Sequence, residues 1–260
     1  MDDEAAVVLL AVYPHDVLRN LTGNFGFISP QAGMLTLKPA FRIDAAGQLR
    51  LIPTLVLTEA EVDDYLRDPA RFHPDDLFAW DGPEGGVELH FPYAWAVVKL
   101  LGNRRLWRGV RRSVTGYPES ADFLRPGHHS RGFELTFAIV QEFVRVATQR
   151  GRRAMVLVLP EEEAIRYHRK SGTWTYDALI AAMAAASIPV LNVGEAFERY
   201  LGPHDPGALF ESTQHYNDAG YRVMAKWIAP ALLEMGVAPM GAPLGPAPAD
   251  PGGPATRPWR

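Results

Sequence analysis

Three apolar runs along the chain predict the strands of a central sheet. They cover residues 5–13, 154–159 and 188–193, and the last two runs stop at Pro160 and Gly194. Continuous apolar runs of this length, rich in β-branched residues, are typical of strands that are buried on both faces. Such strands belong to a sheet that is covered on both sides.

Helical patterns precede the second and third runs. Apolar residues recur every three or four positions over residues 133–147 and again over 176–183, as on the buried face of an amphipathic helix. Gly151 follows the first of these helices and Ser187 the second, and both residue types are typical of the turn between a helix and the next strand. Helix and strand therefore alternate as they do around a parallel sheet, and the predicted fold class is α/β.

The segment between about residues 25 and 130 is predicted to be an excursion from that sheet. Residues 35–57 alternate loosely around residues 45–48, which favours a small hairpin. Thr58, followed by an acidic first turn that includes Glu61, is typical of a capped helix start. No internal repeat is visible.

Loop and helix signals continue toward the C-terminus. Residues 68–92 are rich in Pro, Gly and Asp and indicate a loop, and residues 93–112 predict a helix. One face of that helix carries Ala94, Val97, Val98 and Leu101. From residue 237 onward, 11 of 24 residues are Pro or Gly, which leaves too little apolar area to offset the entropy of ordering. We expect one domain over residues 1–236 and a disordered tail over 237–260.

Composition and charge exclude several functional classes. The chain has no Cys, and its 26 Lys and Arg residues against 30 Asp and Glu residues give a net charge of −4, which offers no reason to bind nucleic acid. No apolar run reaches the roughly 20 residues of a membrane-spanning helix, and no signal peptide is visible. No glycine-rich phosphate loop occurs. We expect no cofactor, no metal, no nucleic-acid partner and no transmembrane segment, while compartment and oligomeric state stay open.

The most specific stretch of the sequence surrounds His215. Asn217 is a suitable N-cap for a helix that begins at Asp218. His215 is then expected just outside a helix N-terminus, whose partial positive charge keeps an imidazole neutral. A neutral imidazole is what a general base needs near neutral pH. The alternative is a loop histidine that only satisfies backbone groups.

This stretch resembles a known family. The pattern His-x-Asn-x-x-Gly, formed by His215, Asn217 and Gly220, is similar to the C-terminal signature of the SGNH (GDSL-like) hydrolases. Three further pieces agree in order, so that the resemblance covers most of residues 5–235. Residues 13–20 resemble the family's Gly-x-Asn-Asp turn, residues 38–44 its Lys-Pro-Tyr-Phe hairpin, and residues 134–160 its next helix and strand.

The resemblance implies both a fold and a reaction. The fold is a flavodoxin-like three-layer α/β/α sandwich, and the reaction is cleavage of a small-molecule or glycan acyl ester by Ser-His-acid chemistry. Acyl transfer to a polysaccharide is a variant of the same chemistry. The residues that the resemblance assigns to the site are His215 as base, Glu211 as candidate acid, Asn217 in support, and His15, Asp16 and Asn20 in the turn that faces the oxyanion.

The chain also departs from the family. No Gly-Asp-Ser nucleophile turn and no Gly-x-Ser-x-Gly elbow occur in it, and His15 stands where the family supplies an Asn. The positions where the acid is expected hold Ser212 and Thr213, with Glu211 one residue further away. We expect little esterase activity from the chain as given. Either the nucleophile is encoded upstream of Met1, or the chain is a remnant whose cleft binds an acyl or glycan ligand.

Three other clusters of charged or histidine residues give weaker evidence for a function. Residues 104–112 hold five Arg and a Trp, which suits either an anionic membrane surface or, as the favoured interpretation, a solvated helix end. His128 and His129, followed by Ser130, lack a neighbouring carboxylate in the sequence and are interpreted as loop. Residues 161–163 are three glutamates that suit the first turn of a helix.

Overall fold

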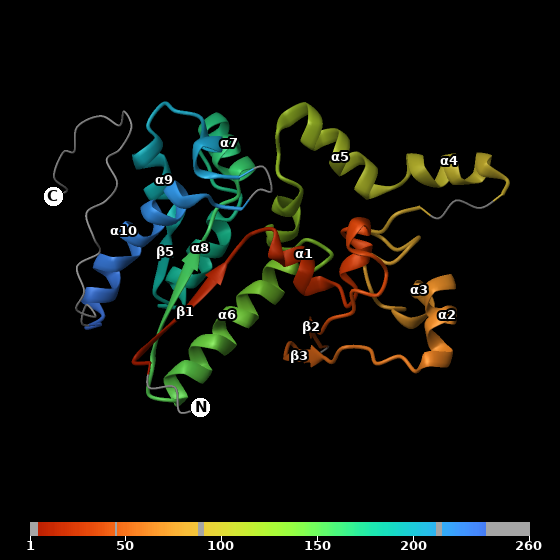
Figure 1. Cartoon of the computed structure of the whole chain (residues 1–260), viewed down its shortest axis with the longest axis horizontal. Coiled ribbons are helices and arrows are strands. Elements are labelled where there is room, and N and C mark those ends of the chain that lie inside the picture. The colour runs from red at the N-terminus through yellow and green to blue at the C-terminus, as the bar shows by residue number, and fades with distance from the viewer. Residues whose placement is uncertain (1–4, 45, 88–90, 212–214, 238–260) are drawn as a thin grey trace.

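The computed structural model describes residues 5–44, 46–87, 91–211 and 215–237 (Figure 1). Its strands are β1 (Val7–Val12), β2 (Ala40–Ile43), β3 (Leu49–Ile52), β4 (Arg153–Val158) and β5 (Val190–Asn192). Its α-helices are α1 (Asp16–Leu21), α2 (Glu59–Arg67), α3 (Pro69–Phe72), α4 (Tyr93–Leu101), α5 (Arg104–Thr115), α6 (Gly132–Gln149), α7 (Glu162–Ser171), α8 (Asp177–Ala185), α9 (Val193–Leu201) and α10 (Asp218–Glu234). Short 3-10 helices include η3 (Glu119–Leu124) and η4 (Pro206–Leu209).

The three apolar runs form a parallel sheet in the order β1-β4-β5, packed against helices. The predicted α/β class is therefore confirmed. Burial on both faces holds for β4, where Val156 and Val158 are fully buried. It is wrong for β1, whose Leu9 is 41% exposed and which pairs, among the described residues, with β4 on one side only. It is also wrong for β5, whose three residues are only half-buried.

The excursion between β1 and β4 contains the expected hairpin and capped helix. Strands β2 and β3 pair antiparallel, and Thr58 and Glu61 form a capping box at the start of α2. The single helix expected over residues 93–112 is wrong. Gly102 ends α4 and the side chain of Asn103 accepts a hydrogen bond from the Leu106 amide, so that α5 starts as a separate helix.

The C-terminal half follows the sequence pattern closely. Helices α6, α8 and α10 cover the segments that were predicted as helical, and Asn217 is the N-cap of α10. Apart from Val237, the predicted disordered tail lies outside the described residues, and so do Ser212 and Thr213. Within the part of the chain that the structure describes, no helix combines the length and the apolar content that a membrane crossing requires.

Candidate functional site

The turn after β1 carries three of the residues assigned from the sequence. The amide of Asp16 donates to the carbonyl oxygen of Tyr13 at 2.9 Å, which closes the turn and starts α1. His15 lies exposed in this turn, and desolvation by the atoms around it lowers the pKa of its imidazole. Asn20 follows one turn of α1 after Asp16, on the same side of the helix.

Asp16 and Asn20 line a cavity of about 340 Å³ that residues of β1, α1 and α6 border. Its apolar wall includes Leu10 of β1 and Ile139 of α6. Lys38 closes one side, where its ammonium group donates to the carbonyl oxygen of Thr22 at 2.7 Å. The cavity thus combines an apolar wall with a few polar side chains, an arrangement typical of sites for small ligands. Neither His15 nor His215 is among its lining residues.

The loop of His215 is anchored to the carboxyl ends of β1 and β4. The hydroxyl of Tyr216 donates to the carbonyl oxygen of Pro160 at 2.6 Å. Its ring packs edge-on against Tyr13, with 6.5 Å between the ring centroids. The loop therefore reaches the edge of the sheet at which the turn with His15 begins. The side chain of His215 itself is exposed.

Glu211 is linked to His215 through the backbone. Its amide donates to the carbonyl oxygen of His215 at 2.7 Å, next to an isolated bridge between Phe210 and Tyr216. The side chain of Glu211 is exposed and makes no hydrogen bond to the His215 ring within the described residues. The structure therefore places Glu211 in the loop of His215. Its role as the acid that orients His215 stays a prediction.

Asn217 and Gly220 have structural roles in the same motif. The Asn217 side chain accepts from the Gly220 amide at 3.0 Å and donates to the carbonyl oxygen of Ala208 at 2.9 Å. A Cβ atom on Gly220 would come within 2.6 Å of the carbonyl oxygen of Leu209, a distance that forces a backbone shift. Both residues thus hold the start of α10 against η4 and thereby position the preceding His215.

Glu161 is a functional candidate that the sequence analysis missed. It follows the end of β4, is 9% exposed, and accepts a hydrogen bond from the Ser120 hydroxyl at 3.1 Å. Burial raises the pKa of its carboxyl group to about 7, which the hydrogen bond from Ser120 counteracts only in part. The available signal was its position at the carboxyl end of a buried strand, where open α/β sheets place their sites. We interpreted it only as part of an acidic helix start.

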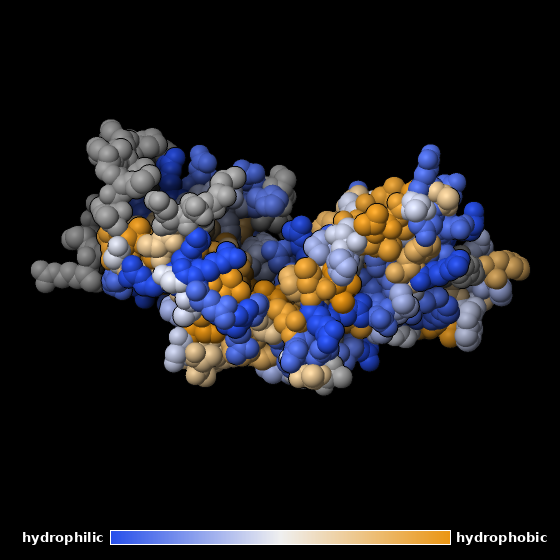
Figure 2. All heavy atoms as spheres, turned by 90° about the horizontal axis from the view of Figure 1, so that it is seen from below, coloured by the Kyte–Doolittle hydropathy of each residue, from blue (hydrophilic) through white to orange (hydrophobic). Residues whose placement is uncertain are grey.

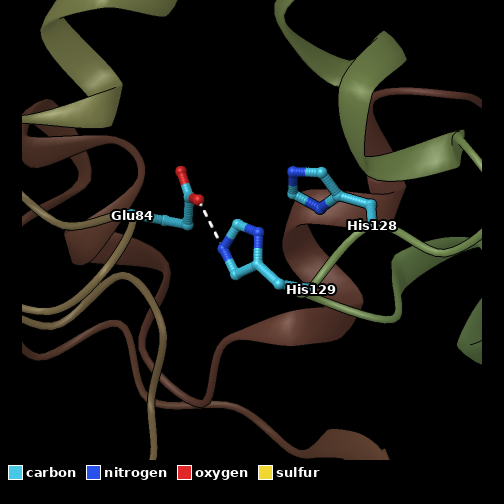
Figure 3. A group of neighbouring side chains, drawn as sticks. All are labelled: Glu84, His128 and His129. Atoms are coloured by element: carbon cyan, nitrogen blue, oxygen red, sulfur yellow. Dashed lines mark ion pairs between the residues drawn. The ribbon is translucent and has the colours of Figure 1, made fainter.

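A second cluster of side chains consists of Glu84 together with His128 and His129, which lie in the loop that precedes α6 (Figure 3). The carboxylate of Glu84 is fully buried and lies 2.7 Å from Nε2 of His129, whose ring packs at 4.2 Å on that of His128. The premise that no carboxylate is near these histidines is therefore wrong, because the fold brings Glu84 from a distant loop. Burial and the neighbouring His129 lower the pKa of His128 to about 4.

These donor atoms lie within 4.8 Å of one another, and their types suit a divalent metal such as zinc. Two guanidinium groups already occupy the surroundings. Arg108 forms an ion pair with Glu84, and Arg104 lies 3.6 Å from the same carboxylate and 2.9 Å from His129. Because these cations already balance the buried charge, the cluster is described best as an ion-pair network that joins α5 to the loop before α6.

Comparison with models of known protein families finds no match to this chain, and comparisons with curated proteins and with solved structures find none either. The fold and the site define an α/β protein with a parallel sheet. The candidate site residues His15 and Glu161 and the loop of His215 lie near the carboxyl ends of β1 and β4.

Proposed function

We propose that this chain supplies the general base of an acyl-ester hydrolase site of the SGNH type. His215 is the base, and the turn with His15 faces the ester carbonyl. The observation that supports this most is the anchoring of the His215 loop by Tyr216 at the carboxyl ends of β1 and β4. The three-layer sandwich that the sequence resemblance implies belongs to the same proposal.

The proposed chemistry needs a hydroxyl, a base and donors to the oxyanion. The hydroxyl attacks the ester carbonyl while His215 accepts its proton, and His215 then returns that proton to the leaving alcohol. His15, whose pKa is lowered by desolvation, donates from a neutral ring to the oxyanion. The cavity beside Asp16 and Asn20 takes the acyl group. No cofactor or metal enters the scheme.

The attacking hydroxyl is not assigned to this sequence. The sequence contains no Gly-Asp-Ser turn, and the buried Ser120 donates to Glu161. We therefore propose that the chain by itself binds acyl esters and hydrolyses them only slowly.

A second candidate function is ligand binding without catalysis. The ring of His215 has no hydrogen bond or ion pair with another described residue, and an imidazole that no acid orients is a poor base. The same cleft would then hold an acyl or glycan ligand. A polysaccharide O-acyltransferase is the related alternative in which a sugar hydroxyl attacks.

The first test is a titration of the chain with short acyl esters, followed by NMR of the histidine ring protons. We expect the signals of His15 and His215 to shift together and saturate at one Kd. The exposed His204, at the far end of α9, is the matched control and stays unchanged. A shift confined to His204 or to His128 rejects the proposed site.

A second test distinguishes a role of His215 as general base from a role in ligand binding alone. The chain is given a chromogenic acetyl ester together with a small alcohol as acyl acceptor. A transfer rate that falls to background in His215→Gln, with ester binding retained, supports general-base chemistry. Binding without any His215-dependent transfer favours the non-catalytic alternative. Covalent labelling of a serine of this chain by a fluorophosphonate contradicts the proposal that the nucleophile is absent from it.

A further inference from the structure

Helix α4 is apolar on nearly every side and yet lies on the surface. Its sequence is Tyr-Ala-Trp-Ala-Val-Val-Lys-Leu-Leu, and of these residues only Ala96 is buried. Trp95 is 62% exposed, and four others are more than half exposed: Tyr93, Val97, Val98 and Leu101. A helix that is apolar all round is normally buried. The described part of the chain does not cover it.

Helix α5 pairs several of its arginines with carboxylates of other segments and leaves an apolar stripe exposed. Arg108 is buried against Glu84, while Arg111 pairs with Asp122 and Arg112 with Glu163. The outward stripe consists of Trp107, Val110 and Val114, at a spacing that places them on one side of the helix. The interpretation of these arginines as a solvated helix end is therefore wrong for the buried Arg108, whereas Arg104, whose side chain is 58% exposed, agrees with it.

Together these side chains form one exposed apolar surface, here called the arm surface. Its members are Tyr93, Trp95, Val97, Val98 and Leu101 of α4 with Trp107, Val110 and Val114 of α5. Helix α4 lies on the side of the molecule away from the parallel sheet (Figure 1). Figure 2, a view of another face of the molecule, shows apolar residues both near its middle and toward its right-hand part. An exposed apolar surface of this extent marks a site of interaction.

We propose that the arm surface docks onto the interface of a lipid bilayer that contains anionic lipids. Tyr and Trp rings prefer the boundary between hydrocarbon and headgroups, and the arm surface carries Tyr93, Trp95 and Trp107. The indole N–H of Trp107 already donates to the carbonyl oxygen of Leu101 at 2.7 Å. This ring can therefore enter the bilayer interface without leaving its donor unpaired.

The charges of the arm also favour an anionic lipid over a second copy of the chain. Residues 93–115 contain six Lys and Arg residues and no acidic residue. Arg104 is more than half exposed, and Arg105 donates to two backbone carbonyl oxygens, those of Phe27 and Ile28. Because Arg104 shares the carboxylate of Glu84 with Arg108, and Arg105 donates to backbone carbonyl oxygens, α5 keeps an excess of positive charge, which anionic headgroups attract and a second copy of the same surface would repel. Five of the six cations already lie in ion pairs with carboxylates of other segments, namely Lys99, Arg104, Arg108, Arg111 and Arg112, so that apolar insertion supplies most of the affinity.

The experiment measures binding of the full chain to vesicles of phosphatidylcholine with phosphatidylglycerol by co-sedimentation. The test variant is the double substitution Trp95→Ser and Trp107→Ser. The matched control is Tyr200→Ser with Leu233→Ser, since both side chains are equally exposed but lie on α9 and α10. Circular dichroism and a thermal melt check that each variant folds. This proposal does not depend on the ester chemistry above.

We expect the natural chain and the control to bind these vesicles, and the test variant to bind about ten-fold more weakly. Quenching of tryptophan fluorescence by brominated lipid is expected in the natural chain and lost in the test variant. Absence of vesicle binding by the natural chain overturns the proposal. Equal binding of the folded test variant overturns it as well. A natural chain that is dimeric by light scattering, and that becomes monomeric in the test variant without binding vesicles, assigns the surface to self-association instead.

Discussion

The hydroxyl of Tyr216 donates a 2.6 Å hydrogen bond to the carbonyl oxygen of Pro160. The two residues lie in different segments, the loop before α10 and the end of β4, so the bond joins the loop of the candidate base to the sheet. Burial raises the pKa of the Tyr216 hydroxyl well above its usual value. The hydroxyl therefore remains a donor over the whole range of pH in which the protein is expected to fold.

The first prediction removes that bond. Tyr216→Phe keeps the ring but leaves the carbonyl oxygen of Pro160 without this donor, and we expect a loss of about 1–2 kcal/mol in the free energy of unfolding. Urea denaturation measures the loss, and the NMR signal of the His215 ring reports whether the loop has moved. Tyr221→Phe is the control, because the Tyr221 side chain is exposed and the change should stay below about 0.5 kcal/mol. Equal losses in both variants would mean that the bond does not anchor the loop.

A second prediction separates the two roles of Asn217. Its side-chain oxygen caps α10, and its amide nitrogen donates to the carbonyl oxygen of Ala208. Asn217→Ala loses both and is expected to cost about 1–2 kcal/mol, whereas Asn217→Asp keeps the cap and should cost less. Thermal denaturation gives the cost, and hydrogen exchange of the Gly220 amide reports the cap directly. If Asp proves as costly as Ala, the donation to Ala208 is the dominant role.

Local periodicity explains why much of the fold was predictable. Apolar runs that end at Pro160 and Gly194, preceded by amphipathic helices, specify alternating elements whatever the rest of the chain does. The cap at Asn217 was predictable for the same reason, because capping depends on a few neighbouring residues. The break of the expected 93–112 helix depends on Gly102 and Asn103, which are also local signals, but the apolar and basic residues on both sides of them continue a helical pattern.

Contacts between distant segments explain what the sequence did not predict. The buried Glu84 contacts His129 and Arg108 only in the folded chain, and the spacing of these residues in the sequence does not predict the contacts. An amphipathic pattern on α5 likewise shows that two faces differ, but it does not say which face points outward. The buried carboxylate of Glu84 holds Arg108 on the inner side of α5, and Trp107 is left exposed.

A third prediction concerns the buried carboxylate of Glu84. Glu84→Gln leaves the buried Arg108 with only the carboxylate of Glu119, 3.9 Å away, as an ion-pair partner, and we expect a loss of about 3 kcal/mol in the free energy of unfolding. Replacing Arg108 by Met in the same chain should restore part of that loss, because the remaining cation is removed. Glu142→Gln breaks an exposed pair with Arg145 and serves as the control, with an expected loss below about 1 kcal/mol.

The same cluster can be probed with zinc. An ion-pair network whose charge is already balanced should gain no stability from the metal, so the Tm of the natural chain is expected to stay unchanged in excess zinc. A rise in Tm that His128→Ala abolishes, and that His204→Ala leaves intact, would contradict this description and make Glu84, His128 and His129 a metal site.

The fourth prediction is a pH dependence of stability that comes from Glu161. Its pKa is raised from 4.5 to about 7 in the folded chain, because burial disfavours the carboxylate. Below about pH 4.5 both the folded and the unfolded chain hold the proton, and the group costs nothing. Between pH 4.5 and pH 7 the unfolded chain ionises while the folded chain keeps its proton, so the free energy of unfolding falls as the pH rises.

Glu161→Gln removes this titration and can still accept the hydrogen bond from Ser120. We therefore expect the variant and the natural chain to be equally stable near pH 4.5, and the variant to be more stable by roughly 2–3 kcal/mol above pH 8. Urea denaturation across that range measures the difference. Ser120→Ala should extend the fall to higher pH, because the lost hydroxyl favours the carboxylate and the folded-state pKa of Glu161 rises further without it. A constant difference between the natural chain and Glu161→Gln at every pH would mean that Glu161 titrates normally, which would contradict the raised pKa of its carboxyl group.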